Sequence, residues 1–481
     1  MRRDRTRSPL WSTNLPRVAD VRAFTFLTFG LLLAGCMVGP NYKRPAIDSP
    51  GSYHGDNQPS TASSESLGSE KWWEVFQDPV LQQLIRTALQ QNYDVRIAAS
   101  RVLQAHAQLG ITRANQFPMV SAGAQAFSER NPKISSSFPS YEANAGEVDL
   151  SVVWNLDFWG KYRRQTEAAR ATLLASQWGH RAVLTSVVSS VASAYFTLRE
   201  LDLALDLSKK TLADRNTSRH LTTVLAKNGS ASALDVRQSE QLVYTAAETI
   251  PDLERQIVQQ ENSLSILLGD GPGPIPRGRS LTEQPNPPTV PVGLPSELLE
   301  RRPDIREAEA ALVAANAEIG VAKAMLFPSI SLTGTAGYES YALNNLFTHS
   351  QRMWNGAGSL TQPIFAAGAL RSGIRLAEAQ KQEMLLTYQQ TIMNAFQEVS
   401  NSLVAYRKNR EYREQQELLT AAAQDTDRLS KLLYQHGGAS YLQVLISENS
   451  DFSAQLNLAQ AQLNERLALV QLYNALGGGW Q

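Results

Sequence analysis

The chain has 481 residues, with 45 basic and 45 acidic side chains, six histidines and a single cysteine. One cysteine excludes an intramolecular disulfide and any zinc or redox centre built on paired cysteines, and the balanced charge argues against nucleic acid as a partner. The sequence contains no HExxH, GxSxG or P-loop pattern, and its histidines show no metal-ligand spacing. We therefore predict that the chain is not an enzyme and uses no cofactor or metal.

The first 35 residues predict a lipoprotein signal peptide. Six arginines precede an apolar stretch over 23–33, and Leu33-Ala34-Gly35 leads into Cys36. Small residues before a cysteine at this place indicate cleavage at Cys36 and lipid on its thiol; the alternative is an unlipidated signal with an incidental cysteine. Residue 37 is Met rather than Asp, so the usual inner-membrane retention signal is missing. We expect residues 36–481, with 39 basic and 43 acidic residues and a net charge of −4, to be anchored by lipid to the outer membrane.

Two halves of the remaining chain repeat each other. Phe117-Pro118 recurs 210 residues later as Phe327-Pro328, and beyond the loop the offset becomes 208, as in Gly229 and Gly437. Such a repeat predicts two copies of one structural unit. The segments are a strap over 36–78, extended over 46–70, repeat 1 over 79–268, a connector over 269–302, repeat 2 over 303–476 and a tail over 477–481. The connector is dense in Pro and Gly and is expected to run over a surface.

Each repeat is predicted to contain a helix, a β-hairpin, a long helix and a return helix. In chain order these are a helix over about 80–116, a hairpin over 117–158, a long helix over 161–228 and a return helix over 233–268, then a helix over 303–326, a hairpin over 327–365, a long helix over 369–436 and a return helix over 441–476. The long segments lack proline, and 68 helical residues extend roughly 100 Å. Ser232 with Asp235, and Ser440 with Gln443, predict capping boxes at the return helices.

The hairpin strands alternate with period two. Apolar residues occupy the even positions Val148, Leu150, Val152, Trp154, Leu156 and Phe158 of the second strand, and Trp354, Leu360 and Ile364 share one face of the fourth. Strands of this length fit a membrane barrel, the alternative being a soluble hairpin packed on helices. Outside the signal no apolar run is long enough for a transmembrane helix. Four strands cannot close a barrel in lipid, and eight would fill their own interior, so a channel requires at least three chains.

Three stretches of the sequence carry a family resemblance. They are residues 36–45 (CMVGPNYKRP), residues 293–305 (GLPSELLERRPDI) with 327–332 (FPSISL), and residues 473–480 (YNALGGGW). With these motifs the chain resembles the TolC-like outer-membrane factors of tripartite efflux systems, in their OprM-like lipoprotein branch. The resemblance implies a mixed α+β homotrimer, in which a twelve-stranded transmembrane barrel continues into a long periplasmic helical barrel with a mixed equatorial belt.

The resemblance also implies partners and a function. The chain would be the exit duct that carries small molecules such as drugs from an inner-membrane pump, of the RND (resistance–nodulation–division) type, and a periplasmic adaptor to the outside. Two alternatives stay open, namely a duct for type I protein secretion and a structural coiled-coil lipoprotein. The transported substrate and the particular pump cannot be predicted from this sequence.

Two sets of residues are candidate functional sites. The turns Asn228-Gly229-Ser230 and His436-Gly437-Gly438 end the long helices, far from the strands, and are expected to contact the adaptor. By resemblance, the narrowest point falls at Leu442 and Ile446, with isoleucine where relatives commonly have aspartate, which suggests an apolar gate. Leu234, Glu240 and Glu448 are further gate candidates, the two acids on a different face from Ile446. The alternative is that Leu442 and Ile446 are ordinary helix-packing residues.

Overall fold

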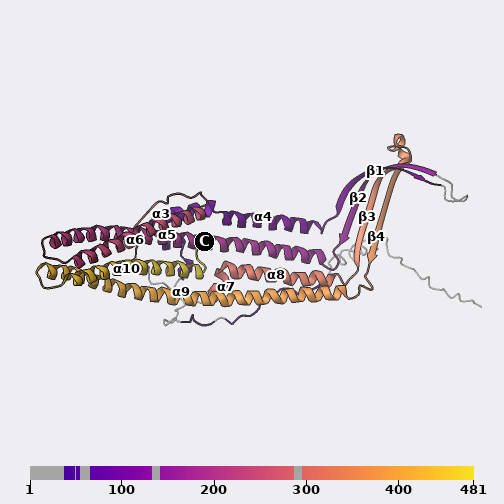
Figure 1. Cartoon of the computed structure of the whole chain (residues 1–481). Coiled ribbons are helices and arrows are strands. Elements are labelled where there is room, and N and C mark those ends of the chain that lie inside the picture. The colour runs from indigo at the N-terminus through magenta and orange to yellow at the C-terminus, as the bar shows by residue number, and fades with distance from the viewer. Residues whose placement is uncertain (1–36, 49, 55–65, 133–140, 286–294, 481) are drawn as a thin grey trace, which may run out of the picture. The chain divides into compact units, whose positions relative to one another are not determined.

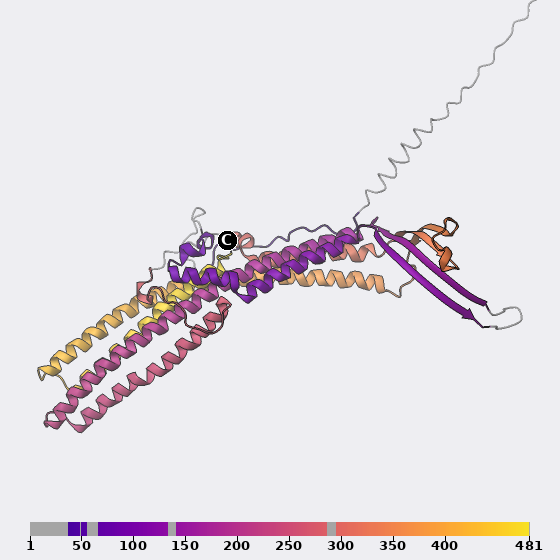
Figure 2. The same cartoon turned by 90° about the horizontal axis from the view of Figure 1, so that it is seen from above.

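The computed structural model describes residues 37–48, 50–54, 66–132, 141–285 and 295–480. The predicted signal peptide and Cys36 lie outside these residues. The chain folds into two compact units made of interleaved segments: residues 1–42, 108–170 and 314–381 form the first, and residues 43–107, 171–313 and 382–481 form the second. The first unit contains the β-sheet, and the second is mainly helical (Figures 1 and 2).

Four antiparallel strands form one sheet in the order β1-β2-β3-β4 (Figure 1). They are β1 (Met119–Asn131), β2 (Tyr141–Leu156), β3 (Ser329–Ser340) and β4 (Arg352–Thr361). Each repeat supplies one hairpin, and β2 pairs with β3 to join the two hairpins. Among the described strands, β1 and β4 each pair along one side only, so both edges of the sheet present unpaired backbone groups.

The sheet has one apolar and one polar face. An apolar row of paired residues consists of Ala122, Leu150, Ala336 and Trp354, and the adjacent polar row consists of Ser121, Ser151, Thr335 and Asn355. The side chains of Leu150 and Trp354 are 57% and 83% exposed. On the polar face, the hydroxyls of Ser121 and Ser151 are hydrogen-bonded at 2.7 Å. The predicted alternation is therefore confirmed, and the apolar face is largely uncovered in a single chain.

Two apolar residues predicted on the strands lie beyond the strand ends. β2 stops at Leu156, before Phe158, because Asp157 turns to accept the backbone N–H groups of Tyr162 and Arg163 at 2.9 and 2.8 Å. β4 stops at Thr361, before Ile364. Here Pro363 intervenes, and proline has no N–H to continue the ladder.

Apart from α3, the main helices recur in pairs of nearly equal length. They are α3 (Pro79–Gln91), α4 (Tyr93–Ala114), α5 (Lys161–Lys227) and α6 (Ala233–Leu268) in repeat 1, and α8 (Pro303–Ala324), α9 (Ala369–Gln435) and α10 (Tyr441–Ala475) in repeat 2. α5 and α9 both have 67 residues, and α4 and α8 both have 22. In the second unit α6 and α10 run beside the long helices (Figures 1 and 2).

One window of α5 is long and apolar enough to cross a membrane, which the sequence analysis did not anticipate. Length and composition are the only grounds for that assignment, and 44% of the window is buried inside the protein. A helix packed in a bundle passes the same test. Val188 and Val191 of α5, for example, are completely buried among other side chains.

The helix predicted over 80–116 is wrong as a single element, because it is divided at Asn92. The Asn92 backbone N–H still bonds to Ala88 of α3, while its side-chain Oδ1 accepts the N–H groups of Asp94 and Val95 at 2.8 and 3.2 Å. The asparagine thus ends α3 and caps α4 in one residue. Its side-chain Nδ2 also donates to the Leu267 carbonyl of α6 at 2.9 Å, which fixes the break against the return helix.

The strap and the connector contain short helices that the sequence analysis missed. They are η1 (Leu67–Ser69), α2 (Trp72–Val75), η2 (Leu281–Glu283), η3 (Pro295–Glu297) and α7 (Leu298–Arg301), where η denotes a 3-10 helix. The β3–β4 loop adds η4 (Leu343–Asn345) and η5 (His349–Gln351). The strap was expected to be extended over 46–70, but residues 67–69 form η1, which corrects that prediction. Leu67 and Trp72 are buried. Both η1 and α2 therefore contribute to the hydrophobic core of the second unit.

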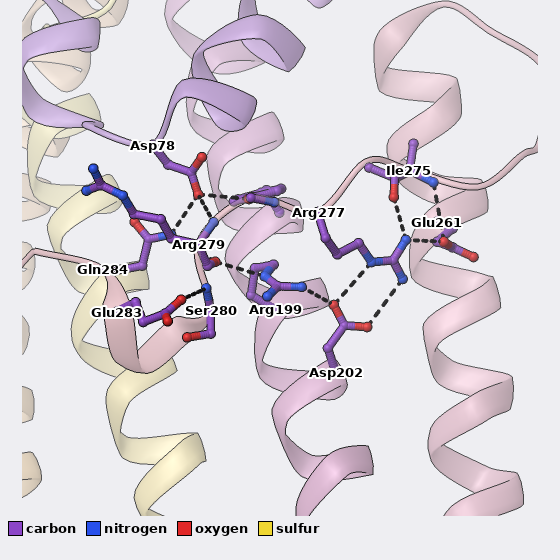
Figure 3. A network of polar contacts seen from close by, with 12 residues as sticks. Asp78, Arg199, Asp202, Glu261, Ile275, Arg277, Arg279, Ser280, Glu283 and Gln284 are labelled. Carbon is purple, nitrogen blue, oxygen red and sulfur yellow. Dashed lines mark hydrogen bonds and ion pairs between the residues drawn. The ribbon is translucent and has the colours of Figure 1, made fainter.

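The described part of the connector runs largely over the surface, as predicted, and polar contacts tie it to the helices (Figure 3). Arg277 bridges two helices, because its guanidinium binds Asp202 of α5 at 3.2 Å and Glu261 of α6. Asp78 accepts the Tyr195 hydroxyl at 2.9 Å and the Gln284 amide at 2.7 Å. The buried carboxylate of Asp78 requires such partners. The polar residues Arg277 and Gln284 therefore fix the path of the connector.

Candidate functional site: the helical turns and the constriction

The two long helices end in the same backbone turn. After α5, the N–H of Gly229 bonds to Ala226 at 3.1 Å and that of Ser230 to Leu225 at 2.9 Å. After α9, the N–H of Gly437 bonds to Tyr434 at 3.0 Å and that of Gly438 to Leu433 at 2.8 Å. This pair of bonds is the Schellman motif, in which a left-handed residue closes the helix.

Glycine is required at both turns by backbone conformation rather than by crowding. Gly229 has φ +75° and Gly437 has φ +76°, which side chains with a Cβ rarely adopt. A Cβ built on either residue would meet nothing within 4 Å among the described residues. Space around both turns is therefore open in the single chain, as expected of a surface that meets a partner.

A polar side chain precedes each glycine and bonds back to its own helix. Asn228 Nδ2 donates to the Val224 carbonyl at 2.9 Å, and His436 Nδ1 lies 2.9 Å from the Leu432 carbonyl, to which it donates in the tautomer that carries a proton on Nδ1. Each of these carbonyls also accepts the backbone N–H of the same residue, at 3.2 Å for Val224 and 3.3 Å for Leu432. The two turns are thus alike in side-chain chemistry as well as in backbone.

The return helices begin differently in the two repeats. In α6 the Ser232 hydroxyl accepts the Asp235 N–H at 3.1 Å, and the Asp235 carboxylate accepts the Ser232 N–H at 2.8 Å. In α10 the Ser440 side chain makes no capping hydrogen bond, so the predicted second capping box is wrong. Gln443 is bonded to Ser440 only through the backbone, at 3.1 Å.

Leu442 and Ile446 lie on the exposed side of α10. They are 52% and 55% exposed, whereas the neighbouring residues Tyr441, Val444 and Leu445 are buried against Leu242 and Tyr434. The burial pattern places Leu442 and Ile446 one turn apart on the face that points away from their own bundle. Two apolar side chains in this position either line a lumen or contact another chain.

The repeat-related face of α6 is less apolar. Leu234 corresponds to Leu442 and is also exposed, but Gln238 corresponds to Ile446. A ring formed from both repeats would therefore contain leucine at one level and would alternate isoleucine with glutamine at the next.

The two acidic gate candidates are engaged in ion pairs. Glu448 is only 8% exposed, binds Lys431 of α9 at 3.0 Å and accepts the Ser218 hydroxyl of α5 at 3.3 Å. Glu240 binds Arg237 at 2.6 Å. Glu448 lies with the buried side of α10 rather than with Leu442 and Ile446, so its charge acts inside the bundle.

Glu448 belongs to a polar cluster that the sequence analysis missed. The cluster borders a small cavity of about 110 Å³ and includes Arg215, Asp427, Lys431 and Asp451. Arg215 Nε, Asp427 Oδ1 and Asp451 Oδ1 are buried without a protein partner among the described residues. The repeat-related positions form no such cluster, because Ala423, Thr223 and Val243 occupy the positions related to Arg215, Lys431 and Asp451. That difference between repeats was the signal that could have revealed it.

Electrostatics inside the cluster pull in two directions. Burial lowers the pKa of Arg215, although the charge of Glu448 partly opposes this. Burial also disfavours the charged form of Lys431, but its hydrogen bond to Asp427 and the charge of Glu448 outweigh that effect and raise its pKa. Lys431 therefore stays charged at neutral pH and ties α9 to α10.

An amphipathic sheet of membrane-strand length, joined to paired long helices, defines a subunit of an outer-membrane channel. A family model described as outer membrane efflux protein matches residues 84–270 and again residues 294–478, which also shows the internal repeat. The chain therefore belongs to the outer membrane efflux protein family, of the TolC/OprM type, and functions as the outer-membrane channel of an efflux system.

Individual relatives match over nearly the whole chain. The probable efflux pump outer membrane protein TtgC of Pseudomonas putida is 38% identical over 454 residues, which cover 93% of this chain and 94% of TtgC. The cation efflux system protein CusC of Escherichia coli K12 is 33% identical over 450 residues, covering 93% and 97%. The open-state MtrE outer-membrane channel of Neisseria gonorrhoeae superposes with a TM-score of 0.85 at 32% identity, covering 93% of this chain and 99% of MtrE.

Proposed function

We propose that three copies of this chain close into one channel, with twelve strands in the outer membrane and a helical barrel in the periplasm. The open four-stranded sheet carries this proposal. Its two edges would leave backbone groups unsatisfied in lipid, and its apolar face is uncovered in one chain. Two chains would give eight strands, whose interior side chains fill, so three is the smallest number that leaves a lumen.

The oligomer is tested by native mass spectrometry of protein extracted from outer membranes in mild detergent. We expect a mass of three chains. A monomer or dimer as the largest species would contradict the proposal. Negative-stain images should show a hollow cylinder, while a solid rod would favour a structural coiled-coil lipoprotein.

The channel is proposed to be anchored by lipid on Cys36 and to receive small molecules from a periplasmic adaptor and an RND-type inner-membrane pump. The relatives support export of small cargo, because their names include toluene and antibiotic efflux as well as cation efflux. Cargo of such different chemistry suggests that the pump, rather than the channel, selects the substrate. Deleting the gene should sensitise cells to the substrates of the pump that uses this channel.

Lipidation is expected to assist sorting more than channel formation, because the sheet itself enters the membrane. Cys36→Ser behind a cleavable signal peptide should still give trimers, in lower yield. Mass spectrometry of the native protein should show an acylated Cys36. An unmodified thiol would remove lipid anchoring from the proposal and leave the channel intact.

The turns at Asn228-Gly229-Ser230 and His436-Gly437-Gly438 are proposed to contact the adaptor. Leu442 and Ile446, together with Leu234, are proposed to form an apolar constriction that stops ions by excluding water. Their exposure on the outward face of the return helices supports this placement. Glu240 and Glu448 are not needed as a source of free charge at the constriction, because each is neutralised by a neighbouring cation.

A further inference from the structure

The short peptide that follows Cys36 lies against two helices of the first unit, and the set of residues that contact it is named the groove. Val38, Gly39, Pro40 and Asn41 form no helix or strand, yet each makes a hydrogen bond to a residue far away in the sequence. The groove is formed by the start of α5 and the end of α8. It therefore draws on both repeats of the chain.

Arg164 of α5 binds this peptide at three points. Its Nε donates to the Val38 carbonyl at 3.1 Å, and its second terminal nitrogen donates to the Gly39 carbonyl at 3.1 Å and to Asn41 Oδ1 at 2.8 Å. The remaining terminal nitrogen is bound by Glu167 at 2.7 Å. The side chain of Arg164 is only 1% exposed, so nearly all its donors are used within the protein.

The rest of the groove fits the peptide by shape. Asn316 of α8 donates to the Pro40 carbonyl at 2.9 Å, and the Val38 N–H bonds to the Trp159 carbonyl at 3.1 Å. Gly39 has φ +100°, and a Cβ there would overlap the backbone of Gly320. Glycine at both positions allows the peptide to lie directly on α8.

The second repeat offers a comparison within the same chain. The neighbouring Arg163 is repeated as Arg371, but the residue related to Arg164 is Ser372. Gly110, related to Gly320, has open space around it among the described residues. The binding arginine is present at one of two related positions, as expected if it serves a segment that occurs once per chain.

We propose that Arg164 is the docking residue for residues 38–41, and that this docking holds Cys36 and its lipid beside the base of the sheet. Met37, which follows Cys36 directly, lies against Gly160 at the start of α5. A docked peptide keeps the anchor where β2 ends, so the sheet of each chain meets the membrane next to its own lipid. The lipid part of this inference rests on the proposed acylation of Cys36.

Trypsin digestion of trimers extracted from outer membranes in mild detergent tests the docking. Cleavage after Lys43 releases the lipopeptide 36–43, and its rate reports how often the peptide leaves the groove. We expect Arg164→Met to accelerate the release by about tenfold or more, since several charge-assisted bonds are lost. Arg170→Met, on an exposed arginine of the same helix, is the matched control and should release at the normal rate. Arg164→Lys should be intermediate, because an ammonium group cannot reach all three acceptors.

A second variant breaks the same contact from the peptide side. Gly39→Ala should accelerate release like Arg164→Met, and the double variant should be no faster than the faster single variant. Normal protection in both single variants would overturn the proposal. If Arg164→Met forms no trimers while Gly39→Ala forms trimers with normal protection, Arg164 acts on the fold alone, and the proposal is wrong. The mass of the released peptide reports acylation independently, so an unlipidated Cys36 would be recognised without affecting the docking result.

Discussion

The ends of the two long helices are repeat-related regions that share a backbone turn but differ in their side-chain contacts. The backbone turns at Gly229 and Gly437 are the same in hydrogen bonding and in φ. After the first turn, α6 begins with a complete capping box and carries a single exposed ion pair. After the second turn, α10 begins without a side-chain cap and borders a buried polar cluster. The shared part is the part that backbone geometry requires. The differing parts are set by side chains that are not repeated.

The largest expected effect comes from the part that the two regions share. Gly437→Trp should abolish export, because it strains a left-handed residue by about 1–2 kcal/mol and places a bulky group on the proposed adaptor surface. Trimers should persist, since a side chain there meets no described residue. Gly437→Asn is the control, because asparagine tolerates this conformation. Export is measured by drug susceptibility and trimers by native gel. Full export in Gly437→Trp would remove the turn from the adaptor contact, and Gly229→Trp shows whether both turns take part.

The next effect separates the outward faces of α10 and α6. The combined change Leu442→Ser and Ile446→Ser should raise the conductance of trimers in planar bilayers severalfold, because a hydrated ring no longer excludes water. Cells should also become permeable to large antibiotics. Leu234→Ser, on the face that already contains Gln238, should raise conductance less. Unchanged conductance in the combined variant would place the constriction elsewhere.

The polar cluster gives a moderate effect that repeat 1 should not show. Glu448→Gln removes the buried partner of Lys431, and because Lys431 is partly exposed we expect trimers to lose about 1–2 kcal/mol of stability. Glu240→Gln, whose partner Arg237 is exposed, should change little. The readout is the temperature at which trimers dissociate.

The stability that the ion pairs of Lys431 contribute to the trimer depends on pH. The pKa of Lys431 is raised above its ordinary value of 10.5, so the stability it provides is complete below that pH and is lost as pH rises past the raised value. The difference between wild type and Lys431→Met should therefore be constant through neutral pH and shrink only in strongly alkaline solution. A difference that vanishes near neutrality would contradict the ion pairs described for Lys431.

The smallest effect concerns the caps. Ser232→Ala should destabilise the start of α6 by about 1 kcal/mol, because it removes a capping box. Ser440→Ala should cost almost nothing, because the Ser440 side chain makes no capping bond. Hydrogen exchange of the first turns of α6 and α10 measures both. Equal loss of protection in the two variants would show that Ser440 is also a functional cap.

Features set by local chemistry were predictable from the sequence. Proline-free runs and glycine turns defined α5 and α9, which end one residue before the predicted ends at 228 and 436. Period-two alternation defined the faces of β2. Features set by contacts distant in sequence were not predictable. Asn92 divides a helix because its amide reaches Leu267, and the connector is tied to α5 and α6 because Arg277 binds Asp202 and Glu261.

The candidate site divides in the same way. The spacing of Leu442 and Ile446 predicted that they share one helix face, but that this face is exposed depends on the packing of α10. The engagement of Glu448 with Lys431 and Ser218 could not, because it depends on three helices meeting side by side. The role of Arg164 could not be predicted for the same reason. A lone arginine near the start of a helix reveals nothing until the peptide that it binds is placed.

The equal lengths of α5 and α9 restrict how this channel can evolve or be engineered. Removing seven residues from one of them would retract its turn by about 10 Å and leave the other projecting. An adaptor that contacts both turns would then meet a stepped rim. Length changes must therefore occur in both repeats together. Chimaeras with relatives of different duct length should exchange both long helices with both return helices, because a half-exchanged chain would be mismatched with itself.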